Sequence, residues 1–399
     1  MQKKGLVYGL AGLGLFILAF GVAYLVGGKL LKPDSEVNTP STTQSKLANA
    51  KKPAFDPALP RTEVCPLNGQ LYPKVARDIW ETRSPLAVMI ENHVDARPLS
   101  GLGSADIVYE AIAEGGITRQ MGIFYCGATA GNITVAPVRS ARIYFVNLVS
   151  EYNALYTHVG GAGNCDDPNV DPRAKALCAI NRFNVKNLDQ MGKAGAFNVC
   201  HRISGRLDHD VAYEHTMACF TDELYKAGAK WGWTNVDENK VPWDKNFVSW
   251  KFKSASEKST GSPATTVSYM FWASNREFNK AYDDQWDYDQ ATNSYKRTNG
   301  GQVAVDLNTG DPLMFNNVVV QLTKETFLSD IENHLLYDVI GQGKAFVFQD
   351  GVAISATWTK TTRTSRTVYK DVTTSKEIKF NPGPIWISIV PSGNTVTYQ

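Results

Sequence analysis

The residues with the clearest chemical potential stand just after an apolar segment near position 90. The run 85–91 reads PLAVMIE, which is typical of a short buried strand, and it ends in Glu91. Asn92 and His93 follow at once, and Arg97 lies in the next loop. Ligands of open α/β sheets gather outside the carboxyl ends of the strands, so these side chains could line a binding site. The alternative is that Asn92 and His93 only shape the turn.

A pair of glutamates could supply acid–base chemistry. Glu110 and Glu114 are four residues apart, and this interval places both on one face of a helix that we expect to begin at 104–106. Glycosidases use two carboxyl groups to cleave their substrates. Such a pair is more often a solvated helix face or a partner for arginine. Arg119, at the start of the next predicted strand, could pair with Glu114.

Two arginines form the best candidate for binding an anion. Arg139 and Arg142 flank the start of a helix predicted over 140–152, where free backbone N–H groups favour negative charge. The guanidinium group is always charged, and its fork-shaped donors suit carboxylate or phosphate. The alternative is that these arginines are salt-bridged to Glu91 or Glu110.

Histidines add two further possibilities. His158 ends a strand predicted over 154–159, close to two glycines, and it could be a base, a hydrogen-bond donor or a structural residue. The segment 200–215 is dense in histidine and carboxylate, but its spacing matches no zinc signature. The acidic stretch 283–289 lacks the glycine and glutamate of a calcium loop, and 286–297 reads as a hairpin. No metal and no other cofactor is predicted.

The amino-terminal segment predicts a membrane anchor. Residues 5–28 contain no charged side chain, and a helix of this length would reach ~36 Å, enough to cross a ~30 Å hydrocarbon core. A cleaved signal peptide is the alternative, although its apolar stretch is usually only ~7–15 residues long. We therefore expect 1–31 to be a transmembrane anchor whose partner is membrane lipid. The proline-containing stretch 32–62 is expected to be a disordered linker.

Charge balance and cysteine usage indicate the partners and the compartment. With 41 lysines and arginines against 39 aspartates and glutamates, the chain lacks the basic excess of a nucleic-acid-binding protein. The six cysteines all follow the apolar segment and form no CxxC pair, which suits disulfides in an oxidising compartment. Many connectivities are possible, and buried free thiols are the alternative. The shortest closures are Cys165–Cys178 and Cys200–Cys219, which leaves Cys65–Cys126.

The remaining sequence divides by its periodicity. Between 63 and 230, strand and helix patterns alternate, which favours an α/β domain. From 231 to 399, strand patterns separated by turn residues favour a β-rich domain, with one helix near 324–333. The predicted fold class is therefore α+β. One transmembrane helix precedes an N-terminal α/β domain, which packs on a C-terminal β-rich domain as one rigid body.

Several long blocks carry a family resemblance. They include PLNG at 66–69, RSPLAVMIENHVDARPLSGLGSADIVYEAIAEGGITRQMGIF at 83–124, APVRSARIYFVNLVSEYNALYTHVGG at 136–161 and GQGKAFVFQDGVAISATWTK at 341–360. In order and spacing these blocks resemble the YerB-like lipoproteins of Gram-positive and related bacteria, a family of unknown molecular function. The resemblance implies the same two domains, an extracytoplasmic location and membrane attachment. It also implies that Arg202, Arg206 and His215 close the cleft formed by the earlier residues. Family members typically carry a lipid anchor, whereas this chain has an uncharged, helix-length segment with no cysteine at its end.

Two functions are compatible with these features. The leading hypothesis is a single-pass protein of the cell membrane whose soluble part is extracellular and binds an anionic wall component or an envelope protein partner. Its cleft would be lined by Glu91, His93, Arg139, Arg142 and His158. The alternative is a hydrolase or transferase directed at the cell wall, with a glutamate or histidine as acid or base. The sequence contains no complete nucleophile–base–orienter signature, so it leaves the question of catalysis open.

Overall fold

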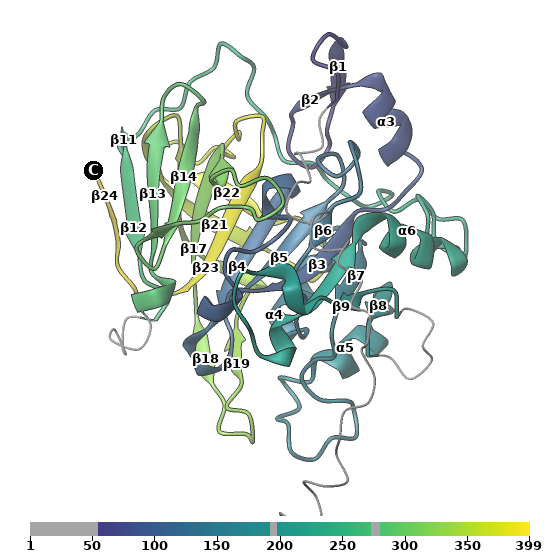
Figure 1. Ribbon diagram of the computed structural model, residues 1–399. Helices are drawn as coiled ribbons and strands as arrows, with labels where there is room; N and C mark the ends of the chain where they lie inside the picture. The colour runs from purple at the N-terminus through teal and green to yellow at the C-terminus, as the bar shows by residue number, and fades with distance from the viewer. Residues whose placement is uncertain (1–54, 192–197, 273–279) are drawn as a thin grey trace, which may run out of the picture. The chain divides into compact units, whose positions relative to one another are not determined.

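The structure of the protein, a computed structural model, describes residues 55–191, 198–272 and 280–399 (Figure 1). The predicted membrane segment at 5–28 and the predicted linker up to residue 54 lie outside these ranges. Across the described residues, no helix is both long and apolar enough to cross a membrane. The last two residues of the predicted linker already belong to β1 (Arg61–Val64), which pairs with β2 (Leu71–Pro73).

Within the described residues, an eleven-stranded mixed sheet forms the centre of the fold. Its order is β11-β21-β20-β17-β23-β4-β5-β3-β7-β8, and β22 pairs with β21. The first predicted region supplies β3 (Leu86–Glu91), β4 (Ile107–Ile112), β5 (Thr118–Phe124), β7 (Leu155–His158) and β8 (Asn187–Asp189). The second supplies β11 (Ser262–Pro263), β17 (Asn317–Thr323), β20 (Gly341–Gln349), β21 (Val352–Lys360), β22 (Val368–Asp371) and β23 (Ile385–Pro391). Because β23 pairs in parallel with both β4 and β17, the two predicted regions share one sheet.

A second sheet, built from the C-terminal region, packs on the first. It consists of β12 (Thr266–Tyr269), β13 (Asp284–Asp289), β14 (Ser294–Asn299), β15 (Gln302–Val303), β16 (Met314–Phe315) and β24 (Val396–Tyr398). Trp286 on β13 meets Trp386 on β23 with ring centroids 5.4 Å apart, and Phe315 on β16 meets the same ring at 5.0 Å. All three side chains are buried, so the facing sides of the two sheets form one core.

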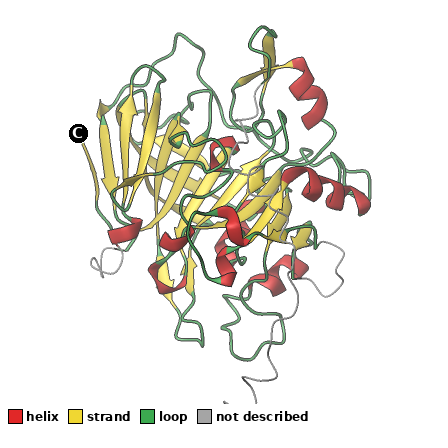
Figure 2. Cartoon of the chain, in the orientation of Figure 1, coloured by secondary structure: helices red, strands yellow, loops and turns green. Residues whose placement is uncertain are grey.

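Figure 2 shows the helices in red, and the α-helices among the described residues come from the first region. They are α3 (Lys74–Trp80), α4 (Ile143–Val149), α5 (Ala176–Arg182) and α6 (Thr221–Lys230). The 3-10 turns are η1 (Val94–Ala96), η2 (Leu102–Ser104), η3 (Glu114–Gly116), η4 (Ser204–Arg206), η5 (Tyr213–His215) and η7 (Lys280–Tyr282). Short strands complete the described chain: β6 (Thr134–Val135), β9 (His201–Arg202), β10 (Met217–Phe220), β18 (Glu325–Phe327) and β19 (Leu335–Tyr337). The fold class is α+β, with strands in the majority.

Local sequence accounts for the longest hairpin. Asp350 and Gly351 are the only residues between β20 and β21, and their φ angles are 57° and 73°. Positive φ at both central positions is the mark of a type I′ turn, whose twist matches that of the strands it joins, and Asp-Gly is a favoured sequence for it. The turn therefore sets the register of the hairpin.

The strands predicted over 85–91, from Arg119 onward and over 154–159 are present as β3, β5 and β7, and the predicted 286–297 hairpin is β13–β14. The strand patterns expected between 231 and 399 are also present, among them β17, β20, β21 and β23. The predicted helix over 140–152 is present as α4. The helix predicted to begin at 104–106 is wrong, because Ile107–Ile112 form β4. All six residues of β4 are buried, since both of its faces are covered within the sheet. A strand buried on both faces lacks the alternation of polar and apolar residues, and its apolar spacing then resembles that of a helix.

The helix predicted near 324–333 is also wrong. Glu325–Phe327 form β18, which pairs antiparallel with β19. Leu328 is buried and packs with Val170 and Ala174 of the first region. Hairpin pairing and this long-range contact outweigh helix propensity, which is a weak determinant in a short segment.

Three disulfides connect the six cysteines in the pairs expected from the shortest closures: Cys65–Cys126, Cys165–Cys178 and Cys200–Cys219. Among the described residues, no cysteine is free. The Cys65–Cys126 bridge ties the β1–β2 hairpin to the end of β5 and closes a loop of 61 residues, whereas Cys165–Cys178 closes one of 13.

Removing the Cys65–Cys126 bridge should destabilise the protein more than removing Cys165–Cys178. In the chain-entropy model the cross-link of the longer loop stabilises the fold by ~4 kcal/mol and that of the shorter loop by ~3 kcal/mol. The difference arises because cross-linking distant residues removes more conformational freedom from the unfolded chain. Urea unfolding of the detergent-solubilised protein should show a larger loss of unfolding free energy for Cys65→Ala with Cys126→Ala than for the other double variant. The opposite ranking would contradict this expectation.

Candidate functional site

The carboxyl end of β3 carries a compact group of charged side chains. Glu91 is buried, with its Oε1 3.1 Å from Nε of Arg139 and its Oε2 2.6 Å from Nδ1 of His215. The ring of His93 stacks on that of His215, with centroids 4.7 Å apart and planes inclined by 18°. The structure thus brings together four predicted site residues that come from three separate segments of the sequence.

Backbone pairing explains why these residues meet. The segment 137–139 runs beside β3, and its Pro137 carbonyl accepts a hydrogen bond from the Glu91 amide. On its other side, the Val138 amide donates to the carbonyl of Met217, just beyond η5. The glutamate, the arginine and the histidine therefore lie on neighbouring extended segments.

Glu91 and His215 form a carboxylate–imidazole pair. When Nδ1–H of His215 donates to Glu91, the carboxylate holds the ring in one tautomer and leaves Nε2 as an acceptor. This arrangement is the base-and-orienter part of a hydrolytic site. Within the described ranges, no hydroxyl or thiol group hydrogen-bonds to the ring, so the pair lacks a nucleophile there.

A metal ion is poorly matched to the histidines at this site. His93, Asp95 and His215 place potential ligand atoms within 4.8 Å of one another. However, Nδ1 of His215 is engaged with Glu91. The two imidazole rings are nearly parallel, so their in-plane lone pairs do not converge on one point. The arrangement is better described as a stacked pair.

A second group surrounds Glu114 in η3. Arg142 donates to both carboxylate oxygens, at 2.6 Å for the Nε–Oε1 contact, and the expected partner Arg119 lies 3.7 Å away. Burial would raise the pKa of Glu114, but the charge and hydrogen bonds of Arg142 outweigh it and hold the pKa at about 2. Glu114 therefore stays ionised near neutral pH and is unsuited to donate a proton.

Glu110 does not join Glu114, and their expected pairing on one helix face is wrong. Because Glu110 lies on strand β4, its side chain enters the core, where Arg297 donates to its Oε2 at 2.7 Å. The same guanidinium donates through Nε to Asp284 Oδ1 at 3.0 Å. Glu110, Asp284 and Arg297 are each at most 2% exposed.

Amide side chains complete this buried network. Asn92 donates to Glu110 at 3.1 Å, and Asn299 donates to Asp284 at 2.8 Å. Burial raises the pKa of Asp284 to about 7 against the opposing charge of Arg297, and the nearby Glu110 adds to the rise. Two carboxyl groups thus share one guanidinium, which favours a proton on Asp284 in the folded state.

Two other arginines, the half-buried Arg97 and the buried Arg206, have no carboxylate partner among the described residues. Arg97 donates only to neutral oxygens: Asn92 Oδ1 at 3.0 Å, the Asn92 carbonyl at 3.1 Å and the Ala281 carbonyl at 2.9 Å. Arg206 donates to the carbonyls of Ala96 and Pro98, both at 2.6 Å. Burial lowers the pKa of each guanidinium to about 10, and Arg297 adds to the effect at Arg97. The turn after β3 is therefore flanked by two poorly compensated positive charges.

A pocket of about 430 Å³ opens over Arg97 and contains no part of the Glu91 group. Its polar floor consists of Asn92, Arg97, Arg297 and Asn299, and its apolar walls include Val94, Leu99, Val303 and Leu313. An apolar cavity with a few convergent polar groups is the usual form of a small-molecule site. We refer to it as the Arg97 pocket.

Two predicted site residues do not enter either group. His158 is fully buried, with Nδ1 2.7 Å from the Gly160 carbonyl and Nε2 2.8 Å from Asn187 Oδ1. Burial lowers its pKa, which favours a neutral structural ring. Arg202 donates to the Tyr213 carbonyl and lies 4.0 Å above that residue's ring. Both serve local structure.

Sequence reasoning missed the residues that the second region contributes. The sequence indicates Asp284 only as part of the acidic stretch 283–289 and Arg297 only as the end of the 286–297 hairpin, and Asn299 lies beyond that hairpin. Their side chains reach the site because β13 and β14 pack against β4. Alternating burial along β14 marks which of its residues face inward, but it does not show which carboxylate they meet.

Replacing Asp284 by asparagine should change the pH dependence of stability. Because the folded-state pKa is raised from 3.8 to about 7, the folded protein binds an extra proton between these values, and this stabilising contribution is lost as the pH rises through them. Asp284→Asn removes the titration with little change of shape. Its unfolding free energy relative to wild type should therefore increase between about pH 5 and pH 7.5, as measured by urea unfolding. A difference that stays constant with pH would refute the assignment.

Comparisons with known proteins cover both halves of the described chain. Residues 73–228 match the N-terminal domain, and residues 274–387 the C-terminal domain, of the family described as "Protein of unknown function (DUF3048)". The protein named "Putative lipoprotein YerB" from Bacillus subtilis (strain 168) is 30% identical over 310 residues, which are 77% of this chain and 82% of that protein. The crystal structure of the YerB protein from Bacillus subtilis matches with a TM-score of 0.64 and 26% identity, over 84% of this chain and 100% of that chain.

Proposed function

The chain belongs to the YerB-like family with its two domains of unknown function, and on that basis we propose that it is a membrane-anchored extracytoplasmic envelope protein that binds an anionic component of the envelope. The name of the Bacillus relative as a lipoprotein supports attachment to the outer side of a membrane. In this chain the uncharged segment 5–28 is the proposed anchor. Three disulfides support an oxidising compartment.

The observation that carries the binding proposal is the state of Arg97. Its guanidinium is half-buried, donates hydrogen bonds only to neutral oxygens, lies 5.1 Å over the Tyr282 ring and faces a cavity of about 430 Å³. A buried charge is costly unless it is paired, and a ligand anion in the cavity would supply the partner that the described residues do not. Anion binding therefore removes an electrostatic penalty that the unliganded protein carries.

The charges on the pocket lining support the same ligand class. Carboxylates balance the arginines around the end of β3, where Asp95 and Glu214 lie beside His93 and Arg139. The residues that line the Arg97 pocket itself include two arginines, Arg97 and Arg297, and no carboxyl group. This local positive charge attracts anions and strengthens their binding at low ionic strength.

The pocket walls narrow the ligand further. Val94, Leu99 and Val303 contact whatever fills the cavity, so the anionic group should be attached to a carbon-containing body. A phosphate or a carboxylate would suit the guanidinium fork equally well. The proposed ligand is therefore a segment of a polymer whose repeating unit carries one of these groups.

Retention of defined polymers tests the proposal. The full-length protein in nanodiscs should retain poly(glycerol phosphate) or polygalacturonate and should not retain dextran. Retention of the first polymer would identify the ligand group as a phosphate, and retention of the second would identify it as a carboxylate. Arg97→Gln should weaken retention at least ~10-fold, because a charge-assisted bidentate contact is lost. Gln302→Glu should also weaken it, since this exposed pocket residue would add a negative charge without touching Arg97.

The control is Arg173→Gln, which removes an exposed arginine paired with Asp171. This variant should retain the polymers as wild type does. Equal retention of dextran and both polyanions by the wild type would defeat the proposal. So would unchanged retention in the folded Arg97→Gln and Gln302→Glu variants.

A second candidate function rests on the Glu91–His215 pair. Its 2.6 Å contact would suit a base held by an orienting carboxylate in a cell-wall hydrolase or transferase. The binding hypothesis is favoured because Arg139 also contacts Glu91, and because no nucleophile joins the pair within the described residues. The two hypotheses differ in whether wall material is changed.

Incubation with purified cell walls separates them. We expect the wild-type protein to release no soluble reducing sugars or amino groups, because the site lacks a complete catalytic set. Heat-inactivated protein provides the background. Release above this background that His215→Gln abolishes, in a variant with wild-type thermal stability, would establish the hydrolase instead.

A further inference from the structure

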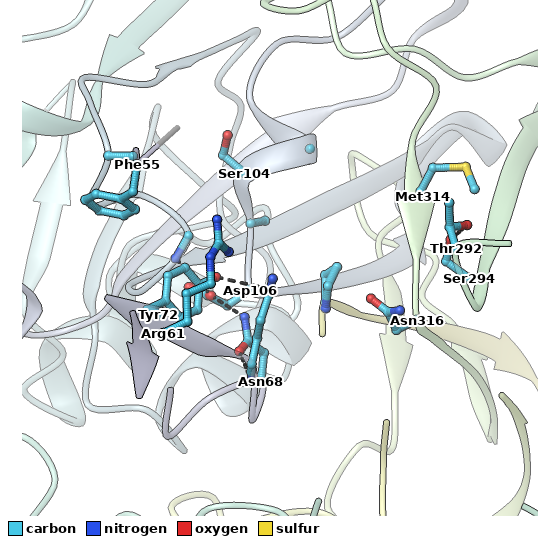
Figure 3. A pocket seen from close by; sticks show the side chains of 16 residues that line it. Phe55, Arg61, Asn68, Tyr72, Ser104, Asp106, Thr292, Ser294, Met314 and Asn316 are labelled. Carbon is cyan, nitrogen blue, oxygen red and sulfur yellow. Dashed lines mark hydrogen bonds between the residues drawn. The ribbon is translucent and has the colours of Figure 1, made fainter. Parts of the chain in front are cut away.

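A second pocket of about 430 Å³ lies between the β1–β2 hairpin and the β13–β14 turn, and none of the predicted site residues lines it. Figure 3 shows its two walls. Arg61, Tyr72 and Asp106 lie on one side, and Thr292 and Asn316 lie on the other. We propose that this pocket, which we call the Asp106 pocket, binds a neutral saccharide unit.

The wall on the N-terminal side is held rigidly by Asp106. This buried carboxylate accepts hydrogen bonds from the Tyr125 amide at 2.7 Å, the Gly127 amide at 3.0 Å and Asn68 Nδ2 at 2.7 Å. The Cys65–Cys126 disulfide joins the same two segments of chain. A pocket whose walls are fixed in advance loses little conformational entropy when a ligand binds.

Several polar groups on the walls have unused hydrogen-bonding capacity. Among the described residues, no partner contacts the Ser104 hydroxyl or the guanidinium of the exposed Arg61. Gln70 lines the pocket with its side-chain amide, and only its oxygen is engaged, by Tyr72 at 3.4 Å. Asn316 uses its Nδ2 on a backbone carbonyl at 2.9 Å, which leaves its Oδ1 available. The free groups are thus a mixture of donors and acceptors.

This mixture, rather than an excess of one charge, indicates the ligand class. Sugar hydroxyls both donate and accept, so they can satisfy amide, hydroxyl and guanidinium groups together. The lining contains one guanidinium, Arg61, and one carboxyl group, Asp106. Burial raises the pKa of Asp106 to about 7 despite its N–H donors, so the floor carries only part of a charge at neutral pH. The Asp106 pocket therefore has no excess of charge of either sign to bind a strongly ionic ligand, whereas the lining of the Arg97 pocket has two arginines and no carboxyl group.

Aromatic side chains complete the site. Phe55 and Tyr72 line the same wall and are only partly buried. The Tyr72 ring is held edge-on against Trp80, with centroids 5.6 Å apart and planes at 85°. Such rings offer flat apolar surface to the C–H faces of a sugar, while the polar groups engage its hydroxyls. The volume lies within the ~300–1,000 Å³ typical of small-molecule sites.

Calorimetry with defined oligosaccharides tests this inference. The full-length protein in detergent should bind cellotetraose or tetra-N-acetylchitotetraose, and should bind tetragalacturonate and tetralysine at least ten-fold more weakly at this pocket. Ser104→Trp, which fills the pocket, should weaken binding of the neutral sugar at least ten-fold. Ser104→Ala and Arg61→Ala should each weaken it several-fold, because each removes one unpartnered group without removing a contact within the protein.

The matched control is Ser256→Trp, which places the same ring at an exposed serine outside the pocket. Its sugar affinity should equal that of wild type. Absence of binding of both neutral sugars would overturn the inference, as would unchanged binding in the folded Ser104→Ala and Arg61→Ala variants. In the opposite case, the wild type binds tetragalacturonate or tetralysine more tightly than the neutral sugars. If these two variants also weaken that binding, the assignment of a neutral ligand is wrong. Retention of polyanions is measured separately, so failure here leaves the proposal for the Arg97 pocket intact.

Discussion

The arrangement of the two sheets depends on the buried contact of Arg297 with the carboxyl groups of Glu110 and Asp284. Glu110 comes from β4 in the central sheet, whereas the other two residues come from neighbouring strands of the second sheet. Because desolvation offsets most of the attraction, such a group adds little net stability. Loss of one partner would leave a buried charge unpaired and cost ~3–5 kcal/mol. We regard the contact chiefly as a constraint that admits one packing of the two sheets. The Arg297 guanidinium also lies 4.3 Å above the ring of Trp386, which anchors it to β23.

The same contact fixes the candidate site. Asn92 donates to Glu110 and accepts from Arg97, so the turn after β3 is positioned by a carboxylate of the central network. Glu91, Glu110 and Glu114 each hold an arginine of their own. Arg97 donates hydrogen bonds only to neutral oxygens and lies over the Tyr282 ring. These three carboxylates are thus already paired with other arginines, and the positive charge of Arg97 has no carboxylate partner among the described residues.

The two pockets differ in a way that suits different parts of one envelope polymer or two separate ligands. The Arg97 pocket has a cationic floor and apolar walls, whereas the Asp106 pocket has balanced charge, free amide and hydroxyl groups and aromatic rings. Residues from both halves of the chain line each pocket. The rigid wall of the Asp106 pocket depends on the Cys65–Cys126 disulfide, which forms in an oxidising compartment. An envelope polymer would be encountered in the same compartment.

Local features of the sequence predict β3 with its polar end, the helix α4 and the 286–297 hairpin, because periodicity and turn residues act over short distances. Cysteine spacing favours the observed disulfides but leaves other connectivities and free thiols open, and the Cys65–Cys126 pair is 61 residues apart. The sequence places Glu91, His93, Arg139, Arg142 and His158 in one cleft, but only the first three lie together. Arg142 pairs with Glu114 instead, and His158 is buried against a backbone carbonyl and an amide oxygen. Local periodicity is also misleading at β4, where burial on both faces removes the strand alternation, and it therefore places Glu110 beside Glu114. The true partner of Glu110 is 187 residues away in the sequence. Pairing at that distance depends on the order of strands across β23, which local periodicity does not encode, and so only the tertiary structure decides which arginines are left without a carboxylate.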